Sequence, residues 1–332
     1  MTKEHFFDLA QLAYTEILTP TLEESLHFFT EYLGMFIVDR TEKSIYLKAY
    51  EETYHHSLKL TESTEPGVGA IGWRAVSPQG LQRRVKIIEE AGYGIGWTTG
   101  DQGYGETYQF KTPSGHVMEL FWDVEYYKPL ETEKTSLLNR AQKRPNRGVP
   151  VRRLDHINLM VNDVDKMSQF LTDVLGFKMR EYVRFENGKM ASSWLSVSNL
   201  VHEIALTLDP TAETGRLHHV AYWYGYPQNL YDVADLLKEN GIFMEGGPGK
   251  HGISQAFCLY VYEPGGNRIE FFGDTGYLIF DPSFEPVVWD LKDIPGKGDI
   301  WIGAPLPPTF ITYGTPIREV KQPPVPAPIM QS

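Results

Sequence analysis

Residues 12–35, LAYTEILTPTLEESLHFFTEYLGM, decide how this chain is organised, because residues 154–177, LDHINLMVNDVDKMSQFLTDVLGF, follow the same pattern. Each stretch begins with a short apolar run typical of a strand and continues with apolar residues at helical spacing. Each ends at a glycine, Gly34 in the first and Gly176 in the second, where helices commonly stop. The two stretches therefore predict the same strand–helix unit, occurring twice.

Capping residues mark the start of each predicted helix. Thr21 and Glu24 have the spacing of a capping box, and Asp163 precedes the second helix as its N-cap. Thr21 and Asp163 are separated by the same number of residues as the two glycines that end the helices. A constant offset across a whole unit indicates an internal duplication.

The duplication extends along the rest of the chain. Residues 69–93 resemble 215–242 as a strand, a helix and a glycine, and residues 108–123 resemble 259–274 as a hairpin with Pro and Gly in its turn. We therefore predict an α+β fold of four βαβββ modules in two similar domains, each an open, barrel-like mixed sheet with helices outside. The predicted boundaries are 1–130 for the N-terminal domain, 131–150 for a linker, 151–290 for the C-terminal domain and 291–332 for an extension with a proline-rich tail.

Composition argues against several kinds of partner. The chain has 332 residues and a formal net charge of −12, which disfavours nucleic acids and anionic membranes. Its one cysteine, Cys258, can form no disulfide within the chain, and this fits a reducing compartment. The sequence also lacks an apolar run of about 18 residues, the length that a membrane-spanning helix needs. We expect a cytoplasmic protein that binds neither nucleic acid nor membrane.

The segment RLHHVAYWYG (216–225) places two histidines side by side in a predicted strand. Neighbours on a strand point to opposite faces, so the two cannot play the same part. His156 and His219 each follow a leucine by two residues on equivalent strands, which selects His219 over His218 as the match for His156. Glu270 lies on the last strand of the fourth module. Two imidazoles and a carboxylate on separate strands are typical of a non-heme ferrous site.

The N-terminal half offers an internal comparison. It has Tyr14 in place of the first histidine, Trp73 in place of the second and Glu119 in place of the glutamate. Without imidazoles, that half is expected to hold no such metal. The residues alone leave the C-terminal trio open to two interpretations, because a buried histidine is more often a hydrogen-bonded core residue than a ligand.

A longer signature lies between Gly249 and Glu270, in GKHGISQAFCLYVYEPGGNRIE. It runs glycine-x-histidine, a spacer, an aliphatic residue and tyrosine, an acidic residue with Pro-x-Gly, and finally glutamate. With this signature, residues 5–290 resemble the type I extradiol ring-cleaving dioxygenases of the vicinal oxygen chelate superfamily, and among them the catechol 2,3-dioxygenases. The matching residues are His251, Leu259, Tyr260, Glu263, Pro264, Gly266 and Glu270.

The resemblance implies a metal-dependent enzyme, a homotetramer that binds Fe(II), or in some members Mn(II), and cleaves a catechol with O2. Catechol itself would give 2-hydroxymuconic semialdehyde. His202, on a predicted strand just before the fourth module, would be the acid–base catalyst. The resemblance assigns His156, His219 and Glu270 to the metal, His202, His251 and Tyr260 to catalysis, and Trp194 and Asn158 to substrate binding.

Two glycines bear on the choice of substrate. Members that act on homoprotocatechuate carry arginines that pair with its carboxylate, and the corresponding positions here are Gly246 and Gly298. The loss of this clamp favours catechol or a small alkyl- or chlorocatechol. Homoprotocatechuate, a bicyclic diol such as 2,3-dihydroxybiphenyl, a non-oxidative reaction of the same superfamily and a non-catalytic binding role stay open as alternatives.

Overall fold

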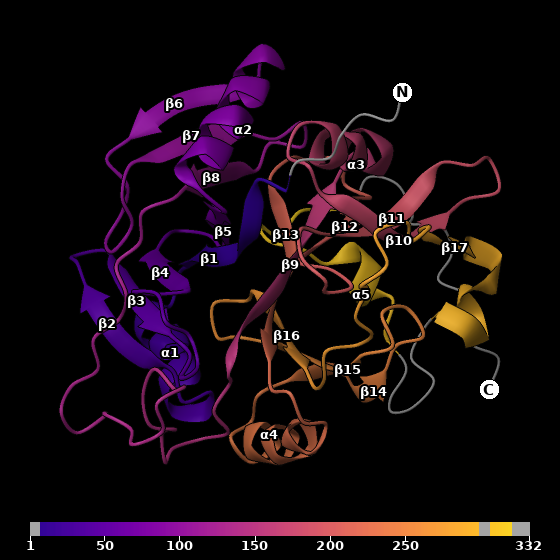
Figure 1. The fold of residues 1–332 in the computed structure, drawn as a ribbon. Helices are drawn as coiled ribbons and strands as arrows, with labels where there is room; N and C mark the ends of the chain where they lie inside the picture. Colours follow the sequence, from indigo (N-terminus) through magenta and orange to yellow (C-terminus); the bar gives the residue numbers. More distant parts are fainter. Residues whose placement is uncertain (1–6, 299–305, 321–332) are drawn as a thin grey trace.

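The computed structural model describes residues 7–298 and 306–320, which form two similar halves lying side by side (Figure 1). The first two βαβββ modules make the N-terminal half. Its elements are β1 (Leu9–Thr19), α1 (Leu22–His27), the π-helical turn η1 (Phe28–Tyr32), β2 (Phe36–Arg40), β3 (Ser44–Lys48), β4 (Leu58–Glu62), β5 (Gly67–Ala75), α2 (Pro78–Glu90), β6 (Gly94–Thr98), β7 (Thr107–Lys111) and β8 (Val117–Phe121).

The C-terminal half repeats the same order and adds a short extension. Its elements are β9 (Arg153–Val161), α3 (Val164–Asp173), β10 (Lys178–Arg184), β11 (Met190–Ser196), β12 (Ile204–Leu208), β13 (Arg216–Trp223), α4 (Gln228–Glu239), β14 (Met244–Lys250), β15 (Phe257–Tyr262), β16 (Arg268–Phe272), β17 (Val287–Asp290), η2 (Leu291–Asp293), η3 (Ile294–Gly298) and α5 (Thr309–Thr312).

Two modules meet at the middle of each sheet. In the described residues, the first sheet has the order β2-β3-β4-β1-β5-β8-β7-β6 and the second β14-β15-β16-β13-β9-β12-β11-β10-β17. The antiparallel pairs β1–β5 and β9–β13 join the modules. Both sheets stay open, and the helices lie on their outer sides (Figure 1). The predicted α+β fold of four modules is confirmed, with β17 as an additional edge strand.

The two halves share one hydrophobic core. Trp73 of β5 packs edge-on against Phe177 with ring centroids 4.9 Å apart, and Tyr93 packs against Phe170 of α3 at 4.7 Å. These four residues belong to one continuous cluster or pack against it. Burial of apolar surface therefore stabilises the halves against each other as well as separately. Residues 131–150, all of them described, form no helix or strand, and the domain boundaries stay a prediction.

The helix caps agree with the sequence in one module and differ in another. The Asp163 carboxylate accepts a hydrogen bond from the Lys166 amide at 2.9 Å, as expected of an N-cap. The predicted capping box of Thr21 and Glu24 is wrong, because the buried Thr21 hydroxyl has no hydrogen-bond partner among the described residues. The Thr21 amide instead donates to the Thr19 hydroxyl, at the end of β1.

Glycine ends the first helix of each half, as predicted. Gly34 has a φ of +63° and Gly176 of +79°, a left-handed conformation that glycine adopts without a side-chain clash. None of the helices in the described part of the chain is long and apolar enough to cross a membrane.

Candidate metal centre and active site

Two rows of residues cross one face of the C-terminal sheet. Strand pairing places Tyr260, Glu270, Ala221 and His156 in one row, across β15, β16, β13 and β9. Residues in register on neighbouring strands share a face, so their side chains lie together. The second row contains His219, Asn158, Ala205 and Trp194, across β13, β9, β12 and β11. The rows therefore bring six of the predicted site residues, His156, Asn158, Trp194, His219, Tyr260 and Glu270, to one side of the sheet.

Three donor atoms converge where the rows meet. His156 Nε2 lies 2.9 Å from Glu270 Oε2 and 3.2 Å from His219 Nε2, and the third separation is 3.0 Å. All three side chains are buried, with at most 4% of their surface exposed. Bonds of about 2.1 Å from one ion to donors at right angles would place those donors about 3.0 Å apart. The donor set therefore fits a divalent metal on its chemistry and its spacing.

Electrostatics favour a cation at this point. Burial alone would raise the pKa of the Glu270 carboxyl, but the two imidazoles hold it well below its usual range. Burial lowers the pKa of His219 to about 4. It would lower the pKa of His156 as well, but Asp155 and Glu270 raise that pKa to about 9. A metal ion would displace the proton from His156, and the ionised Glu270 would then supply the negative charge that two neutral imidazoles lack.

Tyr260 links the donor set to His251. The Tyr260 hydroxyl donates to Glu270 Oε1 at 2.7 Å, so it accepts from His251 Nε2, also at 2.7 Å. Cys258 lies close by, with its sulfur within 4.8 Å of donor atoms of His251 and Glu270. The structure thus brings together the two predicted catalytic residues His251 and Tyr260 beside the predicted metal ligand Glu270.

His202 reaches the donor set from a loop. Its ring centroid lies 4.2 Å from that of His156, and only 4% of the residue is exposed. The prediction that it lies on a strand is wrong, because residues 197–203 form the connection between β11 and β12. Its Nδ1 is buried and has no hydrogen-bond partner among the described residues. Burial also holds the pKa of His202 well below its usual value.

Trp194 and Asn158 lie in the same row as His219. Asn158 is 5% exposed, and its side-chain oxygen accepts from the Thr207 hydroxyl at 3.1 Å. Trp194 is half-buried on β11. Both side chains share the face of the donor set, as expected of residues that line a substrate pocket.

Residues 11–120 and 153–271 each match the Glyoxalase/Bleomycin resistance protein/Dioxygenase superfamily. Over 97% of its length the chain is 59% identical to a metapyrocatechase from Geobacillus stearothermophilus, of which it covers 98%. The chain belongs to this superfamily, among its extradiol dioxygenases.

Other members of the superfamily have names that give a different substrate, and in one case a metal. A manganese-dependent 2,3-dihydroxybiphenyl 1,2-dioxygenase from Geobacillus genomosp. 3 is 39% identical, over 91% of this chain and 96% of its own length. The solved structure of homoprotocatechuate 2,3-dioxygenase from Arthrobacter globiformis superimposes with a TM-score of 0.83 at 27% identity, covering 97% of this chain and 96% of that one. Both relatives therefore share the whole duplicated architecture of this extradiol dioxygenase.

In the N-terminal half of this dioxygenase, other residues occupy the positions of the donor set. Gly72 pairs with both Tyr14 and Glu119, as Ala221 pairs with His156 and Glu270. The matches of Tyr14 and Glu119 are thus confirmed, and the Tyr14 hydroxyl donates directly to the Glu119 carboxylate.

The predicted match of Trp73 to His219 is wrong. Two residues before Ala221 is His219, and two residues before Gly72 is Ala70, while Trp73 pairs with Leu12 and packs in the core. Trp73 matches His219 only when Gly69 is aligned with Gly215, whereas strand pairing sets the position of a residue on the sheet.

The buried Glu119 carboxyl should make the free energy of unfolding depend on pH. Burial raises the pKa of Glu119 from its usual 4.5 to about 7. The folded state therefore binds this proton more tightly than the unfolded state, and stability should fall as the pH rises from 4.5 to 7. Relative to Glu119→Gln, the wild type should lose on the order of 3 kcal/mol across this interval in urea unfolding. A difference that stays constant with pH would contradict this prediction.

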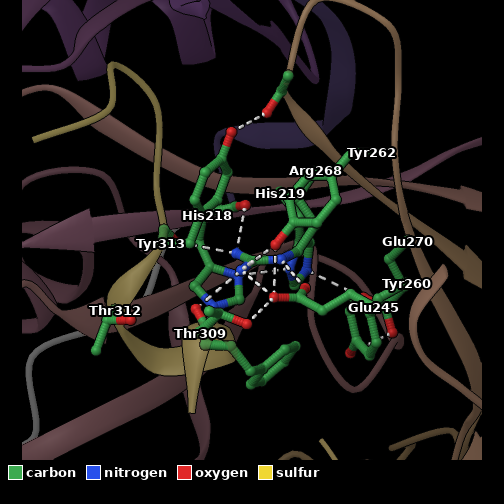
Figure 2. Close-up of polar contacts among 12 residues, drawn as sticks. His218, His219, Glu245, Tyr260, Tyr262, Arg268, Glu270, Thr309, Thr312 and Tyr313 are labelled. Atoms are coloured by element: carbon green, nitrogen blue, oxygen red, sulfur yellow. Dashed lines mark hydrogen bonds and ion pairs between the residues drawn. The ribbon is translucent and has the colours of Figure 1, made fainter. Parts of the chain in front are cut away.

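A C-terminal segment crosses the edge of the site. We call residues 306–316 the C-terminal strap; Figure 2 shows Thr309, Thr312 and Tyr313 of the strap beside His218 and Arg268. Arg268 donates to the carbonyl oxygens of Thr309 and Tyr313 at 3.2 and 3.0 Å. It also donates to both carboxylate oxygens of Glu245, at 2.5 and 3.0 Å.

The buried Arg268–Glu245 pair should be essential for stability. Neither side chain has measurable exposure, so Arg268→Met leaves an unpaired carboxylate in the interior. We expect a loss of about 3–5 kcal/mol in the free energy of unfolding, measured with urea. The matched control is Arg184→Met, because Arg184 pairs with Asp290 at 2.7 Å with both side chains at least 40% exposed. It should cost less than about 1 kcal/mol, and equal losses in the two variants would contradict the prediction.

Sequence reasoning missed the contacts of the strap. Alternation on a strand predicts that His218 faces away from the donor set, yet its imidazole lies against His219 and the strap. The only signal in the sequence was the histidine pair itself, since Phe310 stands 92 residues further along the chain.

Proposed function

We propose that this protein is a catechol 2,3-dioxygenase, which cleaves the ring of catechol beside its two hydroxyls with O2 to give 2-hydroxymuconic semialdehyde. The proposal is carried by the convergence of His156, His219 and Glu270 within 2.9–3.2 Å. Its further support is a relative named metapyrocatechase that is 59% identical over nearly the whole chain.

We propose Fe(II) as the resident metal and Mn(II) as the alternative. Imidazole and carboxylate donors suit both ions, and one relative is named as manganese-dependent. A bound divalent ion would lower the phenol pKa of catechol and hold the catechol next to O2. His156, His219 and Glu270 would hold this ion.

The remaining site residues would handle protons and the ring. His202 would accept the second phenol proton and later return it to the departing oxygen, because a neutral imidazole has both an accepting and a donating nitrogen. Tyr260 and His251 would hydrogen-bond the oxygens of the substrate. Asn158 and Trp194 would hold the ring in the pocket beside the metal.

The surroundings of two glycines support an uncharged substrate. Gly246 pairs with Tyr260, and a Cβ added there would meet the Leu306 side chain at 2.5 Å. A Cβ on Gly298 would meet Ile294 at 2.6 Å. Both places where a carboxylate clamp is expected are therefore apolar, and we propose catechol or a small alkyl- or chlorocatechol as substrate.

The test begins with metal-free protein loaded anaerobically with Fe(II) and then mixed with catechol in air. A yellow ring-fission product formed with equal O2 uptake is the expected result. If only 2,3-dihydroxybiphenyl or homoprotocatechuate gives a product, the proposed ring cleavage stands but the proposed substrate is wrong. If no diol causes O2 uptake, the proposal fails.

The quaternary structure and location follow the resemblance as proposals. We propose a homotetramer in the cytoplasm, and light scattering coupled to size-exclusion chromatography measures the assembly directly. A monomer would contradict the proposed homotetramer.

A further inference from the structure

Each donor histidine is contacted at Nδ1 by the residue that precedes it in the chain. His156 Nδ1 lies 2.9 Å from Asp155 Oδ2, and His219 Nδ1 lies 2.8 Å from His218 Nδ1. The usual partner of a metal-binding histidine is a carboxylate, a backbone carbonyl or a water, and an imidazole is not among them. The role of His218 therefore needs an explanation of its own.

A β-bulge explains how neighbours on one strand can meet. Between Leu217 and His219 strand β13 advances two residues while β9 advances one, so His218 is the extra residue of a bulge. Bulges re-aim side chains and are frequent beside active sites. Asp155 occupies the corresponding bulge on β9, between His156 and Leu154.

The N-terminal sheet has the same irregularities without the same side chains. Strand β1 advances two residues between Leu12 and Tyr14 while β5 advances one, which leaves Ala13 in the place of Asp155. The positions that match His218 and His219 are Gly69 and Ala70. The bulges thus belong to the duplicated fold, while the polar side chains on them occur in the half that holds the donor set.

Hydrogen bonding fixes the proton positions in the two histidines. His218 Nε2 lies 2.6 Å from the Phe310 carbonyl oxygen, which only accepts, so Nε2 carries the proton of His218. Nδ1 of a neutral His218 is then an acceptor, and His219 must donate to it from Nδ1. This leaves the lone pair of His219 on Nε2, the atom that faces Glu270 and His156.

The strap is held firmly enough to fix the Phe310 carbonyl. The Leu217 and Thr315 backbones exchange hydrogen bonds of 2.7 and 2.9 Å, and Arg268 binds carbonyl oxygens on both sides of Phe310. Gly314 permits this close approach, because a Cβ there would lie 2.1 Å from the Met160 sulfur. The Phe310 ring also packs against His218, with centroids 4.9 Å apart.

We propose that His218 is a positioning residue for the metal ligand His219. It accepts the Nδ1 proton of His219, and the Phe310 carbonyl of the C-terminal strap ensures that His218 can only accept there. His219 is thereby held in the tautomer and orientation that present Nε2 to the metal. The inference rests on the metal site of the proposed function and extends it to a segment more than 90 residues away in sequence.

Three substitutions separate the two hydrogen bonds of His218. In His218→Asn the amide oxygen takes the place of Nδ1 and accepts from His219, but the bond to Phe310 is lost. In His218→Gln the amide NH2 takes the place of Nε2 and donates to Phe310, but nothing accepts from His219. His218→Leu removes both. Metal-free protein of each kind is titrated with Mn²⁺ alone, and urea unfolding of the same metal-free samples measures stability.

The Asn variant should bind Mn²⁺ within about threefold of the wild type, while the Gln and Leu variants should bind about 10–100-fold more weakly. Asn and Gln variants of equal stability but different affinity would separate positioning from folding. Equal affinity in all three variants, or tight binding by Gln with weak binding by Asn, would overturn the proposal. His219→Ala serves as the reference: if it binds Mn²⁺ like the wild type, the metal site itself is wrong and this inference falls with it.

Discussion

Glu270→Gln should leave the protein folded but without its metal, and should lower the rate of ring cleavage at least about 1,000-fold. The substitution preserves the shape of the side chain and removes the one charge among the three donors. A divalent ion contributes several kcal/mol to such chemistry, which corresponds to a rate factor of this size. The measurements are metal content after dialysis and the initial rate with catechol.

Glu119→Gln is the matched control for this variant. Glu119 occupies the same position in the N-terminal sheet, where Tyr14 stands in place of the first imidazole. This variant should retain its metal and its rate within about twofold. Loss of metal from Glu119→Gln, or full metal content in Glu270→Gln, would move the metal site away from the C-terminal sheet.

His202→Phe should retain metal and lower kcat about 100- to 10,000-fold, the usual contribution of a positioned acid–base group. The ring of His202 lies 4.2 Å from that of His156, centroid to centroid, and its Nδ1 is buried with no hydrogen-bond partner in the described structure. An unpaired ring nitrogen beside the donor set is available to exchange a proton with a substrate bound there. Steady-state rates with catechol and metal analysis of the same sample distinguish loss of proton transfer from loss of metal.

His56→Phe supplies the comparison in the other half. His56 is also fully buried, and its Nε2 likewise lacks a hydrogen-bond partner among the described residues. It lies among the aromatic rings of Tyr14, Tyr46 and Tyr104, so phenylalanine keeps an aromatic ring at this place. This variant should keep kcat within about twofold. Equal losses of kcat in the two variants would remove His202 from the mechanism.

The sequence was enough to predict the modules, because duplication repeats the same hydrophobic periods and glycine stops. The alternation along β9 and β13 also placed His156 and His219 on one face. Alternation could not reveal the bulge at His218, since a bulge changes pairing and not composition. The match of Trp73 to His219 is wrong for the same reason, because only the pairing with the neighbouring strand shows which residues are equivalent.

Contacts distant in sequence were beyond prediction for a different reason. The capping spacing of Thr21 and Glu24 is local, but the Thr19 hydroxyl at the end of β1 takes the Thr21 amide instead. The loop position of His202 and the C-terminal strap depend on tertiary packing, for which a local pattern gives no signal. The resemblance supplied the role of His202 where periodicity could not.

The donor set lies across the pair β9–β13, where the third and fourth modules meet. His156 is separated from His219 by 63 residues and from Glu270 by 114. An ion bound to all three acts as a removable cross-link within the C-terminal half, and its binding energy adds to the stability of the folded protein. In a cell short of metal, we expect the protein to unfold more often and to be degraded by proteases, so that the abundance of the enzyme follows the metal supply.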